Sequence, residues 1–319
     1  MDSVKKKKIL GSILGVTLLC FAIYVLVDKL QEFTIAEVVE GIKSVQLRQL
    51  LFCLLCTIGY YFCCTFYDTL AFRYIGHKLA YYRIALACFV SYAFSTNVGL
   101  PILTSSTMRY RIHSAFGVSA ADTAKVILFC GFTMWIGFLA TAGLVFSILP
   151  FPAKESFLLS PAALRILALA ALILVLVYAW LTIHTRKGVK IWKLTIPHLT
   201  PGILAGQLTV GLLDWIFISL AAYVIMPPML PIPYYQFLEI FMLAQVAGAL
   251  SQVPGGIGVF ESIFLLFLPE QFPVSEVIGS LLLYRVIFYG LPLVAGTLLL
   301  ITHEVNLGTK KSPSHISGQ

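Results

Sequence analysis

Residues 249–264 read ALSQVPGGIGVFESIF, and this stretch breaks a long apolar segment in its middle. Pro254 lacks an N–H and clashes with the preceding helical turn, so a helix that reaches it must end. Three glycines follow within four residues, and glycine adopts left-handed backbone without steric cost. A single acid, Glu261, stands just after the break. The stretch therefore predicts two helical arms joined by an irregular turn.

The composition is that of a membrane protein. Of the 319 residues, 59% are apolar and only 11% are charged. A soluble domain of this size needs more polar surface, and about 20 consecutive apolar residues cross the roughly 30 Å hydrocarbon core of a bilayer as a helix. We expect an all-α polytopic membrane protein with about six full crossings, at 9–27, 46–72, 122–149, 162–182, 200–226 and 276–302.

Two other apolar segments, 84–107 and 234–268, are interrupted near their middle by Asn, Gly or Pro. The second has about 17 residues before its break and 11–13 after it. At about 1.5 Å per residue, neither arm comfortably spans the bilayer core. A re-entrant hairpin, which enters and leaves on one side, resolves this because broken backbone is tolerated where it lines a protein cavity. We therefore expect two re-entrant helical hairpins.

Positive charges indicate the orientation. Four lysines precede the first apolar run, which is too long for a signal peptide and has no A-x-A cleavage site, so we expect a retained signal anchor. With the N-terminus in the cytoplasm and both broken segments re-entrant, sixteen of the 22 basic residues fall on the cytoplasmic side. This distribution agrees with the positive-inside rule and puts both termini in the cytoplasm.

The expected order of segments is an inverted repeat. Residues 46–149 contain two crossings around the hairpin 84–107, and residues 200–305 contain two crossings around the hairpin 234–268 in the opposite orientation. The remaining segments are a signal-anchor helix with an outer amphipathic loop (1–45), a linker crossing with a basic cytoplasmic loop (150–199) and a polar tail (306–319). Two opposed hairpins near the bilayer midplane are typical of secondary transporters, whereas chance similarity of the two halves is the alternative.

The break in the second hairpin predicts a binding site. The helix that follows it presents uncovered N–H groups and a partial positive charge of about half a unit, which suit a phosphate or carboxylate. A simple flexible turn is the alternative. Charges buried in a membrane are costly and usually face a cavity or a partner. We expect Asp214, Glu261 and Arg285 to line one polar cavity, although a structural ion pair without a ligand also fits the sequence.

The first hairpin breaks near Asn97 and leads into the polar run Thr104–Thr107. Arg109 and Arg111 follow beside these hydroxyls, and arginine binds phosphate bidentately. Positive charge that only orients the chain is the alternative. Asp68, near the inner end of its crossing, is expected to be an interfacial anchor. The predicted substrate-binding residues are Asn97, Arg109, Arg111, Asp214, Gly255, Gly256, Gly258, Glu261, Tyr284 and Arg285.

Enzyme motifs are absent from the sequence, which contains no H-E-x-x-H, G-x-S-x-G, P-loop or clustered Asp-rich metal motif. We therefore expect a protein that is not an enzyme, with no catalytic residue, metal or cofactor. The seven cysteines all lie in apolar segments, so Cys53-x-x-Cys56 is interpreted as packing rather than as a redox or metal pair. The net charge of +8 requires no nucleic acid to explain it.

Four stretches carry a family resemblance: SYAFSTNVGLP (91–101), MRYRIHSAFGVSAADTAKVILFCGFTMWIGF (108–138), QVPGGIGVFES (252–262) and LLLYRVIFYGLP (281–292). Together they resemble the membrane domain of the lysylphosphatidylglycerol synthase/flippase family, over roughly residues 45–305. The resemblance implies the part that moves aminoacylated phosphatidylglycerol between leaflets of the bacterial inner membrane. The family's soluble synthase domain has no counterpart among these residues, so no aminoacyl transfer is expected. The polar run before Arg109 departs from the glycine-rich form that the resemblance implies.

These observations lead us to expect a lipid flippase or transporter that moves a phospholipid or aminoacyl-phospholipid-like lipid across the bacterial inner membrane. The expected partner is membrane phospholipid; a separate lipid-modifying enzyme and a homo-oligomer are left open. Without an ATP-binding motif, the driving force must be a gradient or the asymmetry of the lipid itself. The alternatives are a non-catalytic scaffold for a lipid-modifying enzyme and a membrane-embedded lipid transferase that uses Glu261 or Asp214 as base.

Overall fold

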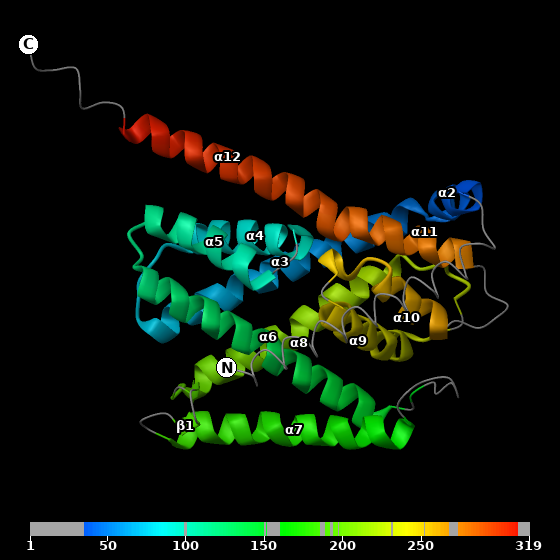
Figure 1. Ribbon diagram of the computed structural model, residues 1–319, viewed down its shortest axis with the longest axis horizontal. Helices are drawn as coiled ribbons and strands as arrows, with labels where there is room; N and C mark the ends of the chain where they lie inside the picture. Colours follow the sequence, from blue (N-terminus) through cyan, green and yellow to red (C-terminus); the bar gives the residue numbers. More distant parts are fainter. Residues whose placement is uncertain are drawn as a thin grey trace, which may run out of the picture.

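The computed structural model is an all-α polytopic membrane protein, as expected from the composition (Figure 1). The structure describes residues 35–98, 101–149, 151, 160–185, 189–191, 194–196, 198–230, 232–251, 253–267 and 274–311. The predicted first crossing, 9–27, lies outside the described residues, and so does the end of the predicted polar tail.

Helices make up nearly all of the described chain. They are α2 (Ile35–Ser44), α3 (Leu47–Ile75), α4 (Tyr81–Val98), α5 (Pro101–Ala115), α6 (Ala120–Ile148), α7 (Pro161–His184), α8 (Pro201–Val224), α9 (Tyr234–Ser251), η1 (Pro254–Gly256), α10 (Val259–Phe267), α11 (Val274–Arg285), the π-helical η2 (Val286–Gly290) and α12 (Leu291–Lys311). Several begin at a side-chain cap. The hydroxyls of Ser119, Ser160 and Thr200 accept the backbone N–H three residues further on, which satisfies part of the open first turn.

Five of the described helical segments are long and apolar enough to cross a membrane. They are α3, α6, α7, α8 and the continuous rod of α11, η2 and α12, which is apolar over Val274–Asn306. Each coincides with a predicted crossing to within a few residues at most ends. The rod continues to Lys311, so helix extends into the segment predicted as a polar tail. The long apolar helices predicted at these five positions are therefore confirmed.

The basic loop between α7 and α8 differs from the all-helical expectation. It contains a two-stranded antiparallel ribbon of β1 (Val189–Ile191) and β2 (Leu194–Ile196), with Val189 opposite Ile196. Apolar and polar residues alternate in both strands, which is the period of a strand and not of a helix. The ribbon lies within the loop between α7 and α8 and is not part of the helical bundle.

The two interrupted segments form helical hairpins, α4 with α5 and α9 with α10, and the two arms of each hairpin pack against each other. The first hairpin extends from Tyr81 to Ala115, well beyond the predicted 84–107. Its longer arm has 18 residues and α10 has nine. At about 1.5 Å per residue both are shorter than a bilayer core of roughly 30 Å. Broken helices of this length are tolerated in a membrane where the break faces protein or a cavity.

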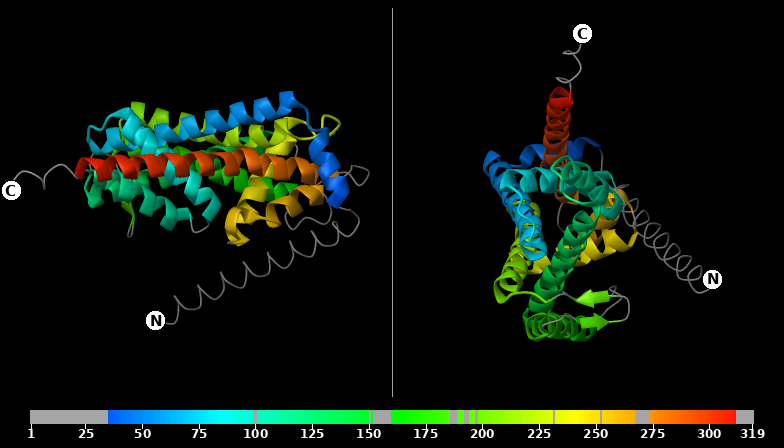
Figure 2. Two further views of the ribbon diagram at one scale, coloured as in Figure 1. Left: turned by 90° about the horizontal axis from the view of Figure 1, so that it is seen from above. Right: turned by 90° about the vertical axis from the view of Figure 1, so that its left-hand side faces the viewer.

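Figure 1 shows the hairpins entering the bundle from opposite ends, so that their tips meet near its middle, and Figure 2 shows the same arrangement from above. Contacts between α4 and η1 confirm that the tips touch. The rod of α11, η2 and α12 contacts both hairpins, through α4 and α10. This opposed placement agrees with the geometry of an inverted repeat, while the division of the chain into such repeats stays a prediction.

Helices α3, α6 and α8 form the packed centre. A Cβ added to Gly137 of α6 would lie 2.5 Å from the Cα of Gly211 on α8, so the two backbones touch at this point. Small residues allow such close approach between membrane helices. All six cysteines that the structure describes are buried and form no disulfide among themselves, as expected of packing residues. Large apolar side chains on α7, including Ile166 and Leu176, instead point outward, as a lipid-facing surface requires.

Candidate functional site

The tip of the second hairpin is a chain of left-handed glycines. Gly255, Gly256 and Gly258 have φ angles of 65°, 62° and 83°. Other residues adopt these angles only at a steric cost, which explains why the turn contains glycine at all three positions. A Cβ on Gly256 would also come within 3.2 Å of the Cα of Gly248 on α9, so the tip folds tightly back on its own first arm. The predicted turn is confirmed.

Glu261 closes the first turn of α10. Its Oε2 accepts the backbone N–H of Gly258 at 2.8 Å, and its Oε1 accepts Nε of Arg285 at 2.6 Å. A carboxylate at the third position of a helix commonly caps the N-terminus in this way. One of the uncovered N–H groups that were predicted to suit a phosphate, that of Gly258, is therefore already occupied by the protein's own carboxylate.

Arg285 connects the tip to the rod. Its Nη1 donates to the carbonyl oxygen of Gly255 at 2.8 Å, and its guanidinium lies over the rings of Phe260 and Tyr289, at 5.7 and 5.8 Å from their centroids. The arginine sits where α11 passes into the π-helical η2. Single π-helical turns of this kind occur frequently at functional sites. Tyr284, also predicted as a site residue, is buried and stacks on Phe288.

The tip of the first hairpin reaches the same place. Nδ2 of Asn97 donates to the carbonyl oxygen of Ala93 at 2.8 Å, within its own helix, and to that of Tyr289 at 3.2 Å, within η2. The carbonyl oxygen of Thr96 lies 4.0 Å from the position of a Cβ on Gly255. Two hairpins and the rod thus converge on the Arg285–Glu261 pair.

Arg109 is not at this junction. It is 2% exposed, its Nε and Nη2 donate to the two oxygens of Asp68 at 2.9 and 3.0 Å, and its Nη1 contacts the hydroxyl of Ser105. Its guanidinium also lies over the ring of Tyr92. The prediction that Asp68 is an interfacial anchor is wrong, because the carboxylate is fully buried in this pair. The arginine fork predicted for lipid phosphate is thus already filled by a carboxylate.

Arg111 points away from Arg109. Its Nε donates to Glu304 of α12 at 2.7 Å, at the exposed surface. Residues two apart on a helix lie on different faces, so the prediction that both arginines grip one headgroup is wrong. Side chains two residues apart point to the same side in a strand, but this segment is helical.

Asp214 of α8 is buried and accepts a weak hydrogen bond from the thiol of Cys64 at 3.8 Å. No contact between Asp214 and either Glu261 or Arg285 is seen among the described residues. The structure therefore brings together two of the three charges that were predicted to line one cavity, and places Asp214 with α3 instead.

No protein-family model matches this chain. It is 32% identical over 301 residues to the uncharacterized protein slr0712 of Synechocystis sp., and the match covers 94% of both chains. The chain belongs to the slr0712 family. It is also 29% identical over 237 residues to the inner membrane protein YbhN of Escherichia coli, with 71% of each chain covered.

A shorter match is to part of a protein whose name states an activity. Over 81 residues the chain is 35% identical to a phosphatidylglycerol lysyltransferase of Staphylococcus aureus, which covers 25% of this chain and 10% of that protein. These comparisons support a membrane family related to the one that the sequence resembles, and the likeness to YbhN together with the apolar helices supports a membrane location.

Sequence analysis missed one buried acid of this slr0712-family chain. Glu239 of α9 is 0% exposed, and neither of its carboxylate oxygens has a hydrogen-bond partner among the described residues. The signal was present, since a lone acid stands in the apolar run FLEIFML. The sequence did not show, however, whether this position faces water, lipid or protein.

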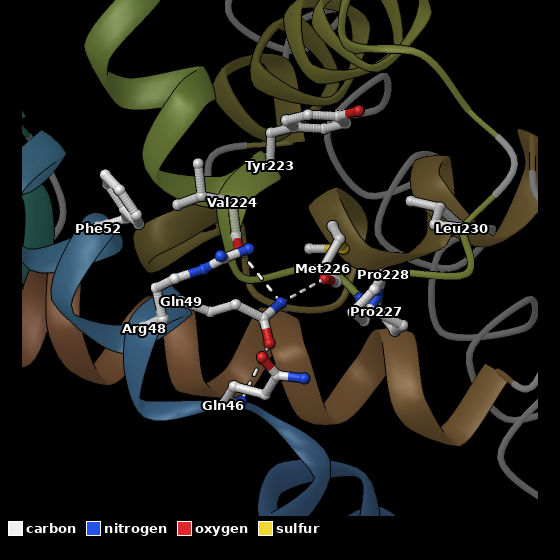
Figure 3. Close-up of a pocket in the computed structure, with 10 residues that line it drawn as sticks. All are labelled: Gln46, Arg48, Gln49, Phe52, Tyr223, Val224, Met226, Pro227, Pro228 and Leu230. Carbon is white, nitrogen blue, oxygen red and sulfur yellow. Dashed lines mark hydrogen bonds between the residues drawn. The ribbon is translucent and has the colours of Figure 1, made fainter.

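A separate pocket of about 280 Å³ lies between the start of α3 and the end of α8 (Figure 3). Gln49 spans the two elements, since its Nε2 donates to the carbonyl oxygens of Val224 at 3.2 Å and Met226 at 2.8 Å. Arg48 lines the same pocket. None of the predicted site residues lines it, so it is distinct from the junction of the hairpin tips.

Proposed function

We propose that this protein moves a phospholipid, or an aminoacyl-phospholipid-like lipid, between the leaflets of the bacterial inner membrane, and that the headgroup passes the Arg285–Glu261 pair. One observation carries the proposal. Two helical hairpins enter from opposite ends and meet at a buried, charged junction. Broken helices and ionisable residues within a membrane protein mark substrate pathways.

The chemistry of the junction suits a phospholipid headgroup. Arginine binds phosphate through several parallel N–H groups, and an apolar setting strengthens such charge-assisted bonds. When a phosphate competes for Arg285, Glu261 keeps its bond to the Gly258 N–H. The freed oxygen of Glu261 is then available to a cationic group on the same headgroup, such as the amine of an aminoacylated lipid.

Two other functions are less well supported. A lipid transferase would need Glu261 or Asp214 as a base, but both oxygens of Glu261 already accept hydrogen bonds, and Asp214 lies beside Cys64 of α3, away from the hairpin junction. A non-catalytic scaffold for a lipid-modifying enzyme is favoured by the short match to part of a lysyltransferase. A scaffold, unlike a transporter, requires no charged junction between two hairpin tips.

The test is lipid translocation by the purified protein in liposomes. A headgroup-labelled phosphatidylglycerol is placed in one leaflet, and its appearance in the other is followed by quenching. We expect translocation by the wild type and its loss in Arg285→Ala, with partial recovery in Arg285→Lys. Arg165→Ala, an exposed site on α7, is the matched control and should behave as wild type.

The outcomes separate the candidates. Absence of translocation by a correctly folded wild type, with any headgroup in a panel of zwitterionic, anionic and aminoacylated lipids, overturns the proposal and leaves the scaffold. Translocation that persists in Arg285→Ala removes the junction from the pathway.

A further inference from the structure

Glu239 is a buried acid without a partner in the first arm of the second hairpin. Neighbouring side chains on α9 are apolar and packed: Leu238 and Met242 lie in a cluster with Phe146 and Leu164, and Ile240 lies in the main core. Neither carboxylate oxygen has a hydrogen-bond partner among the described residues. A charged carboxylate is strongly disfavoured in such a place, whereas its neutral, protonated form is tolerated.

The other acids buried in the described part of the bundle differ from Glu239. Asp68 pairs with Arg109, Glu261 pairs with Arg285, and Asp214 accepts the thiol of Cys64. Structural acids in this protein are thus satisfied by a neighbour, and an acid left unsatisfied in a membrane bundle calls for a functional explanation.

No ionisable neighbour accounts for Glu239. Its arm packs against α6, α8, α10 and η1, and its side chains cluster with Leu164 of α7. The ionisable side chains of these elements and of α9 itself are Asp122, Lys125, Cys130, Arg165, Tyr178, His184, Asp214, Tyr223, Glu261, Tyr234 and Tyr235, with none on η1. None of them forms a hydrogen bond or ion pair with Glu239, and Asp122 and Lys125 pair with each other. Burial alone decides the charge of this carboxyl group.

We propose that Glu239 carries the proton that couples lipid movement to a proton gradient. This proposal rests on the proposed function above. The same helix that holds Glu239 ends at Ser251 and leads directly into the glycine tip beside Arg285. A movement of the second hairpin that opens the Arg285–Glu261 pair also shifts α9. With the hairpin packed, Glu239 holds a proton taken from water on one side. With the hairpin displaced, its carboxyl group meets water and releases that proton to the other side.

The test compares lipid movement with and without a pH gradient in the same proteoliposomes. A gradient of one pH unit can bias the distribution of labelled phosphatidylglycerol by up to about tenfold for each proton carried. We expect this bias in the wild type, its absence in Glu239→Gln with lipid exchange at equal pH retained, and its recovery in Glu239→Asp. Glu276→Gln, an acid at the start of α11, is the matched control.

A second readout does not depend on lipid movement. Infrared difference spectra of the wild type, titrated with acid and base, should contain the band of a protonated carboxyl group that is absent from Glu239→Gln. If the wild type moves no lipid, both proposals fail together. If it moves lipid and Glu239→Gln still follows the pH gradient, only the proton coupling fails.

Discussion

Each hairpin is joined to a neighbouring helix by one arginine–carboxylate pair, Arg109 to Asp68 of α3 and Glu261 to Arg285 of α11, and the two pairs differ in their number of hydrogen bonds and in their burial. In the first, Arg109 binds both oxygens of Asp68, and the side chains are 3% and 0% exposed. In the second, Arg285 binds one oxygen of Glu261, and the side chains are 15% and 6% exposed. Glu261 also accepts the backbone N–H of Gly258, so it keeps a partner when the arginine leaves.

We infer from this difference that the two pairs have different roles, which we call anchor and gate. An anchor holds its hairpin in place, and a gate can open. A buried ion pair is destabilised strongly when one member is removed, because the other charge is left without compensation. Asp68 depends on Arg109 in this way, which fixes the first hairpin against α3. The second pair contacts a turn of left-handed glycines and a π-helical segment, and its carboxylate has an alternative bond. The second hairpin is therefore the one suited to open.

The largest effect on stability is expected from Arg109→Ala. It leaves the Asp68 carboxylate buried and unpaired, which lowers the free energy of unfolding by about 3–5 kcal/mol. Arg285→Ala is expected to lower it by only about 1–3 kcal/mol, since Glu261 retains a charge-assisted bond to the backbone. Denaturant unfolding in detergent micelles measures both.

The double variant Asp68→Asn with Arg109→Gln serves as a control, because it removes both charges at once and should recover part of the loss. Equal losses for Arg109→Ala and Arg285→Ala would show that the two pairs are equally structural. The distinction between anchor and gate would then be abandoned.

A smaller effect is expected from Gly256→Ala at the tip. Its φ of 62° costs an alanine about 1–2 kcal/mol, and the new methyl group meets Gly248. Gly117→Ala is the matched control, since its φ of 80° imposes a similar backbone cost in open space, away from the hairpin tips. Gly256→Ala should lose somewhat more stability than Gly117→Ala because its methyl group also meets Gly248, and only Gly256→Ala should slow lipid translocation in proteoliposomes. Equal translocation by the two variants would exclude the tip from the moving part.

The second pair was predictable from the sequence and the first was not. Glu261 follows a visible helix break, and Arg285 is the basic residue deepest inside a predicted crossing, so few partners were available to either. Asp68 and Arg109 are 41 residues apart and meet only because the first hairpin folds back beside α3. Their pairing depends on tertiary packing, which local pattern does not contain. The same holds for Glu239, whose position in the chain was plain but whose burial was not.

The smallest effect is expected from Arg111→Ala. The pair with Glu304 is short, at 2.7 Å, but the side chains are 57% and 37% exposed. Exposed ion pairs are screened by water and salt and restrain two flexible side chains, so their loss rarely changes stability measurably. We expect wild-type unfolding in micelles and wild-type translocation in liposomes. If Arg111→Ala instead lost translocation at unchanged stability, Arg111 would bind the headgroup after all. The lipid path would then extend from the hairpin junction to the surface shared by α5 and α12.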